Sequence, residues 1–193
     1  LKKINKTIKE DLKKFLKEKN TILDSLSANY KNSYSKKNIL NSKNYKNVRV
    51  VGMGGSIIGT EAIFDFLKPK IKKNFTFISN LETTKIFHAK NNKSLNLIVS
   101  KSGNTLETIA NSNILIKKKD KNIFITENKT SYLSLLAKKL KAEIVHHNNF
   151  IGGRFSVLSE VGMLPAELMG LNSKKFKQLN NLIKNKKFIN FLL

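Results

Sequence analysis

The sequence predicts an α/β fold, a three-layer α/β/α sandwich in which a five-stranded parallel sheet lies between two layers of helices. Two observations carry this prediction: short runs of β-branched and aromatic residues recur along the chain, and stretches with helical periodicity separate them. Strands that alternate with helices form right-handed βαβ units, whose parallel sheet is covered on both faces. The expected strands are residues 48–51, 75–78, 95–99, 122–125 and 143–145, and the expected helices between them are residues 57–67, 82–89, 106–116 and 132–140.

An N-terminal helical extension precedes this core. Apolar residues recur at helical spacing through residues 4–27, with a break near Asn20, so this stretch is expected to form one or two surface helices. Residues 28–46 are rich in Asn, Ser and Lys and contain few apolar anchors, which predicts a connecting loop. We therefore expect residues 1–46 to be a helical segment and linker.

The rest of the chain divides at the end of the last expected strand. Residues 47–150 form the expected α/β domain, and residues 151–193 begin with a glycine pair and continue as helices. The last of these is a lysine-rich amphipathic helix over residues 173–193. Because the first residue is Leu1 rather than Met, we expect the chain to be a piece of a longer protein.

The charge of the chain is strongly positive. Its 37 basic and 13 acidic residues give a formal net charge of +24. Only Arg49 and Arg154 are arginines, the side chain that base and phosphate recognition favours, and the lysines are scattered among 25 asparagines. We interpret this as a compositional bias of the coding sequence, with a functional basic surface as the alternative, and expect no nucleic-acid partner. In either case a positive field raises the local concentration of anionic ligands.

The composition also bears on the compartment. The chain has no cysteine, so it can form neither a disulfide framework nor a thiolate metal site. No apolar run approaches the roughly 20 residues that span a bilayer, and the N-terminus is too polar for a signal peptide. We expect a cytoplasmic protein that does not contact a membrane.

A glycine-rich loop follows the first expected strand. In Val51-Gly52-Met53-Gly54-Gly55-Ser56-Ile57, the glycines allow a tight turn whose amides face a ligand at a helix N-terminus. The dinucleotide fingerprint fails because Ile57 stands where its third glycine belongs, and the P-loop lysine is missing as well. The alternative is a tight strand-to-helix turn without a ligand.

A second loop follows the third expected strand. Ser100-Lys101-Ser102-Gly103-Asn104-Thr105 packs three hydroxyls, an ammonium and a glycine into the start of a helix. A phosphate needs donors from several directions and a positive charge, and this loop supplies both together with the helix dipole. The alternative is plain helix capping by Asn104 and Glu107.

The expected strand order brings these two loops together. In a flavodoxin-like order 2-1-3-4-5, the topological switch point lies between the first and third strands, which end in the two loops. Gly55 and Ser56 would then face the same crevice as residues 100–105. A ligand that bridges them would place a phosphate at the second loop and a polyol body at the first.

Three motifs, in this order, resemble the glucose-6-phosphate isomerase family. They are Gly52-Met53-Gly54-Gly55-Ser56, then Ser100-Lys101-Ser102-Gly103-Asn104-Thr105-Leu106-Glu107-Thr108, then Gly152-Gly153-Arg154-Phe155-Ser156. The serine-rich loop alone is typical of the wider group of sugar isomerase (SIS) domains, whereas the Gly-Gly-Arg-Phe-Ser segment is typical of the isomerase. The resemblance implies a SIS fold and the interconversion of glucose 6-phosphate and fructose 6-phosphate through a cis-enediolate, as in glycolysis and gluconeogenesis.

The resemblance also implies roles for individual residues. Arg154 would be catalytic, stabilising enediolate charge beside the reacting carbons. Gly55 and Ser56 would contact the sugar body. The residues implied to bind the phosphate end of the substrate are Ser100, Lys101, Ser102, Gly103, Asn104 and Thr105. We expect a sugar phosphate as ligand, a homodimer in the full-length protein, and neither a cofactor nor a metal.

The remaining machinery of the family does not map onto this chain. Such isomerases have two SIS domains and take a proton-transferring Glu, a ring-opening His and a Lys from beyond the first. We expect His88, His146 and His147 to be structural or on the surface, and neither Glu160 nor Glu127 to replace the missing base.

Three hypotheses follow. The first is that the chain is the N-terminal, phosphate-binding part of a glucose-6-phosphate isomerase whose residues 151–193 lead into a second SIS domain outside this sequence. The second is a stand-alone SIS module that binds phosphosugars as a sensor or regulator without isomerising them. The third is a basic nucleic-acid binder, disfavoured because aromatic residues do not interleave with the lysines.

Overall fold

The computed structural model describes residues 2–15, 21–81, 93–117, 120–177, 185 and 187. The chain divides into two compact units, one of residues 32–173 and one drawn from residues 1–31 and 174–193. The larger unit holds the sheet and both glycine-containing loops. It extends beyond the expected domain of residues 47–150 at both ends, because helices from the flanking segments pack on the sheet.

The smaller unit contains the helices expected at the N-terminus. Helix α1 spans Lys2–Phe15 and helix α2 spans Thr21–Ser25. Within this unit the ammonium of Lys177 lies 4.3 Å from the ring centroid of Tyr30, a cation–π contact. Helix α8 spans Ser173–Phe176 at the start of the expected C-terminal helix, most of whose residues, like the expected helix 82–89, lie outside the described residues.

The sheet has the predicted strands and the predicted order. In the described residues it contains five parallel strands in the order β2-β1-β3-β4-β5, which confirms the expected α/β class. The strands are β1 (Asn47–Gly52), β2 (Asn74–Ile78), β3 (Ser94–Val99), β4 (Lys121–Glu127) and β5 (Glu143–His147). Gly52 at the end of β1 pairs with Val99 at the end of β3, so the two loops start side by side.

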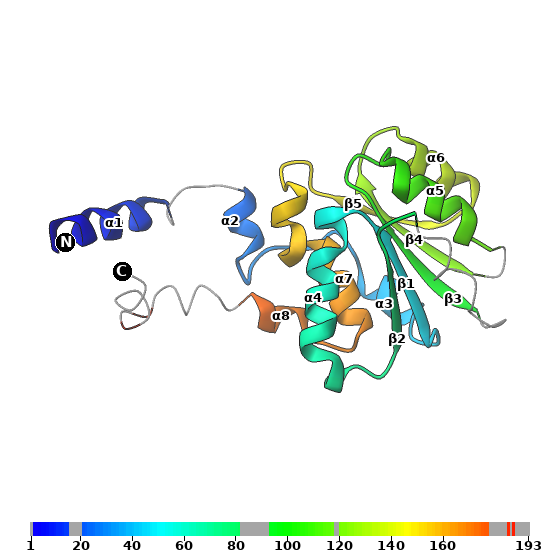
Figure 1. The fold of residues 1–193 in the computed structure, drawn as a ribbon, viewed down its shortest axis with the longest axis horizontal. Coiled ribbons are helices and arrows are strands. Elements are labelled where there is room, and N and C mark those ends of the chain that lie inside the picture. The colour runs from blue at the N-terminus through cyan, green and yellow to red at the C-terminus, as the bar shows by residue number, and fades with distance from the viewer. Residues whose placement is uncertain are drawn as a thin grey trace. The chain divides into compact units, whose positions relative to one another are not determined.

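Helices cover both faces of the sheet (Figure 1). One face packs against α7 (Glu160–Leu168), with α4 (Ile58–Leu67) alongside, through residues such as Leu97, Val99 and Leu164. The other face packs against α5 (Leu106–Leu115) and α6 (Tyr132–Lys139), with Phe124 and Leu133 among its buried residues. Alternate strand residues point to opposite faces, so each strand supplies both cores. Short 3₁₀ helices complete the unit: η1 (Gly54–Ser56), η2 (Lys68–Lys70) and η3 (Gly153–Leu158).

The prediction of a loop over residues 28–46 is wrong for one part of that range. Helix α3 occupies Lys36–Leu40, where the Asn38 side chain accepts a hydrogen bond from the backbone of Ser35 at 2.7 Å, satisfying an amide at the helix start. Asn38 also donates to Glu143 of β5 at 2.7 Å, and Ile39 packs on the core. These long-range contacts stabilise a helix whose local sequence is typical of a loop.

Helix α7 contains Pro165, which is unusual for a helix interior. Proline has no backbone N–H, so the carbonyl of Val161 one turn earlier loses its helical donor. The hydroxyl of Thr60 on α4 approaches this carbonyl at 3.4 Å and replaces that donor in part. The proline is therefore accommodated by a neighbouring helix on the same face of the sheet.

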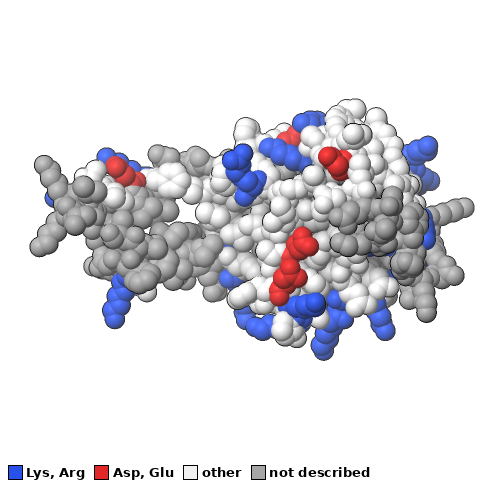
Figure 2. Space-filling view, in the orientation of Figure 1, with Lys and Arg blue, Asp and Glu red and all other residues white. Residues whose placement is uncertain are grey.

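The surface carries the charge seen in the composition. Figure 2 shows Lys and Arg side chains scattered over the described part of the visible face, between a smaller number of Asp and Glu. None of the helices in the described part of the chain has the length and apolar character that a bilayer-spanning segment needs.

Phe124 is fully buried in the centre of β4, so its truncation tests the core. We expect Phe124→Ala to lower the free energy of unfolding by about 3–5 kcal/mol, because the ring leaves a cavity. Phe66→Ala is the control, since Phe66 is 86% exposed, and it should change stability by at most about 0.5 kcal/mol. Urea unfolding followed by circular dichroism measures both, and equal losses would contradict this core assignment.

Candidate functional site

The loop after β3 is held together by its own hydroxyl groups. The hydroxyl oxygens of Ser100 and Thr105 are 2.9 Å apart, so the two ends of the loop are hydrogen-bonded. The amide of Gly103 donates to the Ser100 hydroxyl at 3.1 Å, and the amide of Asn104 donates to the Ser102 hydroxyl at 3.2 Å. Ser100 is buried, whereas Ser102 and Asn104 are exposed. The conformation of the loop is therefore held by hydrogen bonds within the loop itself, with Ser100 buried at its start.

Gly103 has the backbone conformation that the loop requires. Its φ angle is +66°, in the left-handed region that favours glycine. A Cβ atom at this position would lie 2.1 Å from the hydroxyl oxygen of Ser131, at the start of α6. Asn104 reaches the same helix, accepting a hydrogen bond from the amide of Tyr132 at 2.9 Å. The loop is thus fixed against α6 as well as against the sheet.

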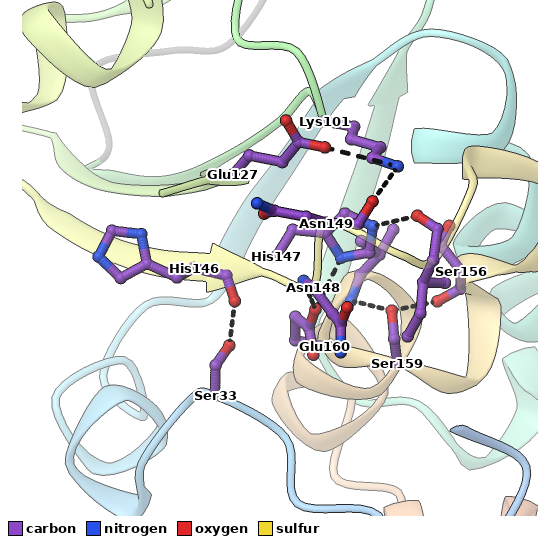
Figure 3. A network of polar contacts seen from close by, with 12 residues as sticks. Ser33, Lys101, Glu127, His146, His147, Asn148, Asn149, Ser156, Ser159 and Glu160 are labelled. Atoms are coloured by element: carbon purple, nitrogen blue, oxygen red, sulfur yellow. Dashed lines mark hydrogen bonds and ion pairs between the residues drawn. The ribbon is translucent and has the colours of Figure 1, made fainter. Parts of the chain in front are cut away.

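Lys101 extends from this loop toward the segment after β5. Its ammonium donates to the backbone carbonyl of Asn149 at 2.8 Å and lies 3.4 Å from the carboxylate of Glu127 (Figure 3). Burial alone would raise the pKa of Glu127, but hydrogen bonds and charges from Lys129 and Lys101 lower that pKa below its ordinary value. The carboxylate of Glu127 thus lies between two lysines. An ammonium has three donors, so Lys101 retains one for a bound anion.

The glycine-rich loop after β1 packs directly on the Gly-Gly-Arg segment. The hydroxyl of Ser156 donates to the carbonyls of Gly153, at 2.6 Å, and Gly55, at 3.2 Å. A Cβ atom on Gly55 would lie 2.3 Å from the carbonyl carbon of Gly153 and 2.8 Å from the amide nitrogen of Arg154. Glycine at position 55 therefore permits an approach that brings Arg154, itself exposed, beside the first loop.

The predicted site residues thus fall into two groups that share one edge of the sheet. Gly55, Ser56 and Arg154 form one group, and residues 100–105 form the other. Lys101 of the second group donates a hydrogen bond to the carbonyl of Asn149, on the segment that leads to Arg154 of the first group. In the described part of the chain, no three His, Cys, Asp or Glu side chains gather closely enough to hold a metal ion.

One feature of this region was not predicted from the sequence. His147 at the end of β5 is buried against Glu160 in the first turn of α7, with Nδ1 2.6 Å from Oε1. Burial raises the pKa of Glu160, but hydrogen bonds from His147 and the backbone of Asn148 lower it below its ordinary value overall. Of the other histidines, His146 is exposed and His88 lies outside the described residues.

A parallel α/β/α sandwich with two loops side by side at its topological switch point belongs to the doubly wound α/β class, whose members bind ligands at the carboxyl ends of their strands. The comparison with known proteins is more specific. A sequence model described as phosphoglucose isomerase matches residues 2–189, which is nearly the whole chain. The chain belongs to the phosphoglucose isomerase family.

Individual relatives agree with this assignment. The glucose-6-phosphate isomerase of Methanocaldococcus jannaschii is 37% identical over 142 residues, which cover 68% of this chain and 35% of that protein. The enzyme of the same name from Borreliella afzelii is 36% identical over 174 residues, covering 75% of this chain and 33% of that protein. The chain thus spans about a third of the length of the curated relatives it matches.

Solved structures show the same fold. A hypothetical protein from Thermus thermophilus superposes with a TM-score of 0.72 at 19% identity, over 98% of this chain and 51% of that chain. The tagatose-6-phosphate ketose/aldose isomerase of Escherichia coli gives a TM-score of 0.56 at 18% identity, over 76% of this chain and 43% of that chain. At these identities the likeness concerns the fold, and it confirms the expected SIS architecture.

The close approach of Gly55 to Gly153 can be tested by adding one methyl group. We expect Gly55→Ala to lower the free energy of unfolding by about 1–3 kcal/mol, because the new Cβ would overlap the backbone of Gly153. Gly152→Ala is the matched control, since a Cβ there would meet Phe155 at an ordinary 3.7 Å. Urea unfolding of both variants measures the difference, and equal stabilities would rule out the packing described here.

Proposed function

We propose that this chain is the phosphate-binding part of a glucose-6-phosphate isomerase, an intramolecular oxidoreductase that interconverts glucose 6-phosphate and fructose 6-phosphate. Membership of the phosphoglucose isomerase family supports this proposal. The observation that carries it is the hydrogen bond from Lys101 of the serine-rich loop to the carbonyl of Asn149, in the stretch of chain that leads to the Gly-Gly-Arg segment. One sugar phosphate could contact both.

The phosphate would bind at the loop after β3. Lys101 would contribute its charge and remaining donor, and Ser102 and Thr105 their hydroxyls. The amides of the first turn of α5 have no acceptor within the helix, so they can also point at an anion. Buried Ser100 would act by holding the loop in shape, as its contacts with Thr105 and Gly103 suggest.

The sugar body would extend toward the first loop. Gly55 and Ser56 would contact its hydroxyl groups, and Arg154 would face the reacting carbons. The guanidinium is always charged and has a rigid array of donors, so it can stabilise the negative charge of a cis-enediolate as that charge develops. This assigns Arg154 an electrostatic role, with the transfer of the proton left to another group.

The proton-transferring base is assigned to a part of the protein outside this sequence. Two carboxylates close to the site both have other partners: Glu160 is buried against His147, and Glu127 lies between Lys101 and Lys129. A chain that spans about a third of its relatives' length leaves room for such a part. A homodimer and a cytoplasmic location complete the proposal, on the strength of the family resemblance and the cysteine-free composition.

Calorimetric titration of the chain with fructose 6-phosphate tests the proposal. We expect Lys101→Ala to weaken binding about 10- to 100-fold, the equivalent of one charge-assisted hydrogen bond. Ser102→Ala should weaken it about fivefold, since a neutral hydrogen bond contributes less. Lys129→Ala is the matched control: it removes the same charge near Glu127 but lies outside the loop, so its effect should be much smaller.

Isomerase turnover is assayed on the same samples. Binding without turnover is the expected result, because the base lies elsewhere. Turnover by this chain would contradict that assignment and make Glu160 and Glu127 the next residues to substitute. A folded sample that does not bind fructose 6-phosphate would contradict the phosphate site itself.

A further inference from the structure

The connection from β5 to α7, residues 148–159, is closed at its base by two buried side chains. His147 precedes the connection and Glu160 follows it, and both side chains are only 1% exposed. The carboxylate oxygen that contacts His147 also accepts a hydrogen bond from the amide of Asn148 at 3.0 Å. One oxygen of Glu160 therefore holds both the last residue of β5 and the first residue of the connection.

Both ring nitrogens of His147 face oxygen atoms. Nδ1 of His147 lies 2.6 Å from Glu160, and Nε2 lies 3.0 Å from the carbonyl oxygen of Ile151. The carboxylate of Glu160 therefore has two buried partners, the ring of His147 and the amide of Asn148. Loss of one partner from a buried pair leaves the other charge uncompensated, which makes the contact sensitive to substitution.

The connection between these two residues touches both halves of the candidate site. Near its start, the carbonyl of Asn149 accepts the hydrogen bond from Lys101. Further on, Gly153 packs on Gly55 and is followed by Arg154. Figure 3 shows Lys101 in contact with Glu127 and Asn149 at the start of the connection, and Ser159 donating to Ser156 near its end. A displacement of the connection at His147 and Glu160 would therefore also move the residues that contact the two loops.

We propose that His147 and Glu160 are positioning residues of the sugar-phosphate site. Their contact holds together the two ends of the connection and thereby determines the positions of Lys101 and Arg154. Neither His147 nor Glu160 contacts the ligand. The inference rests on the proposed function, and it adds that the affinity for a sugar phosphate depends on a buried pair behind the site.

A buried ion pair elsewhere in the sheet provides the comparison that separates an effect on the site from an effect on stability. Arg49 of β1 lies 3.2 Å from Asp120, whose side chain is also 1% exposed. Asp120 precedes β4 at the amino edge of the sheet, opposite the edge that carries the loops. Substitutions at Asp120 therefore remove a comparable buried charge without a route to residues 100–105 or 148–154.

The experiment compares matched variants of the two pairs. Glu160→Ala is compared with Asp120→Ala, and Glu160→Gln, which keeps an acceptor oxygen for His147 and Asn148, with Asp120→Asn. Affinity for fructose 6-phosphate is measured by calorimetry, and amide hydrogen exchange is measured over residues 148–154. We expect Glu160→Ala to weaken binding about tenfold and accelerate exchange. Glu160→Gln should bind more tightly than Glu160→Ala but less tightly than the unmodified chain. Both Asp120 variants should bind with an affinity within about twofold of that of the unmodified chain.

A double-mutant cycle with Lys101→Ala adds a readout that a purely structural role would not move. If Glu160 acts through Asn149 and Lys101, part of the Glu160→Ala effect disappears when Lys101 is already absent. Additive effects, or losses no larger than those of Asp120→Ala, would overturn the inference while the proposed function stands. If the unmodified chain does not bind, the proposed function is overturned and the inference with it. If Glu160→Ala does not fold, Glu160→Gln is compared with Asp120→Asn instead. The inference would be overturned if these two variants had the same affinity for fructose 6-phosphate and the same exchange rates over residues 148–154.

Discussion

The parallel pairing of β1 with β3 is the constraint on which the site depends. Because Gly52 stands opposite Val99, the glycine-rich loop and the serine-rich loop leave the sheet from adjacent strand ends. The chain between them passes through α4 and the edge strand β2 before it returns to the middle of the sheet. Two motifs far apart in sequence thus meet at the topological switch point, where α/β sheets bind their ligands.

The polar groups at this edge are organised before any ligand binds. Ser100 and Thr105 hold each other, Lys101 is oriented by Glu127 and Asn149, and Ser156 joins the first loop to the Gly-Gly-Arg segment. A site held in place in this way needs little reorganisation when an anion arrives, which favours affinity.

Much of this arrangement could be predicted from the sequence, and the parts that could not share a physical reason. The strands, their order and the loops follow from local periodicity and from glycine and serine motifs, so β4 and the loop of residues 100–105 were expected. Helix α3 was not predicted because it is stabilised by long-range contacts, those of Asn38 with β5 and of Ile39 with the core. The pairing of His147 with Glu160 was missed because it depends on how β5 and α7 pack, which no local pattern encodes.

¹H–¹⁵N NMR titration tests most directly whether one sugar phosphate spans both loops. With fructose 6-phosphate, amides of residues 100–105 and of residues 54–56 and 153–156 should shift together and saturate at the same concentration. Inorganic phosphate should shift residues 100–105 first, since it lacks the sugar body. Shifts confined to lysine-rich surface segments, or saturation of the two loops at different concentrations, would contradict a single site.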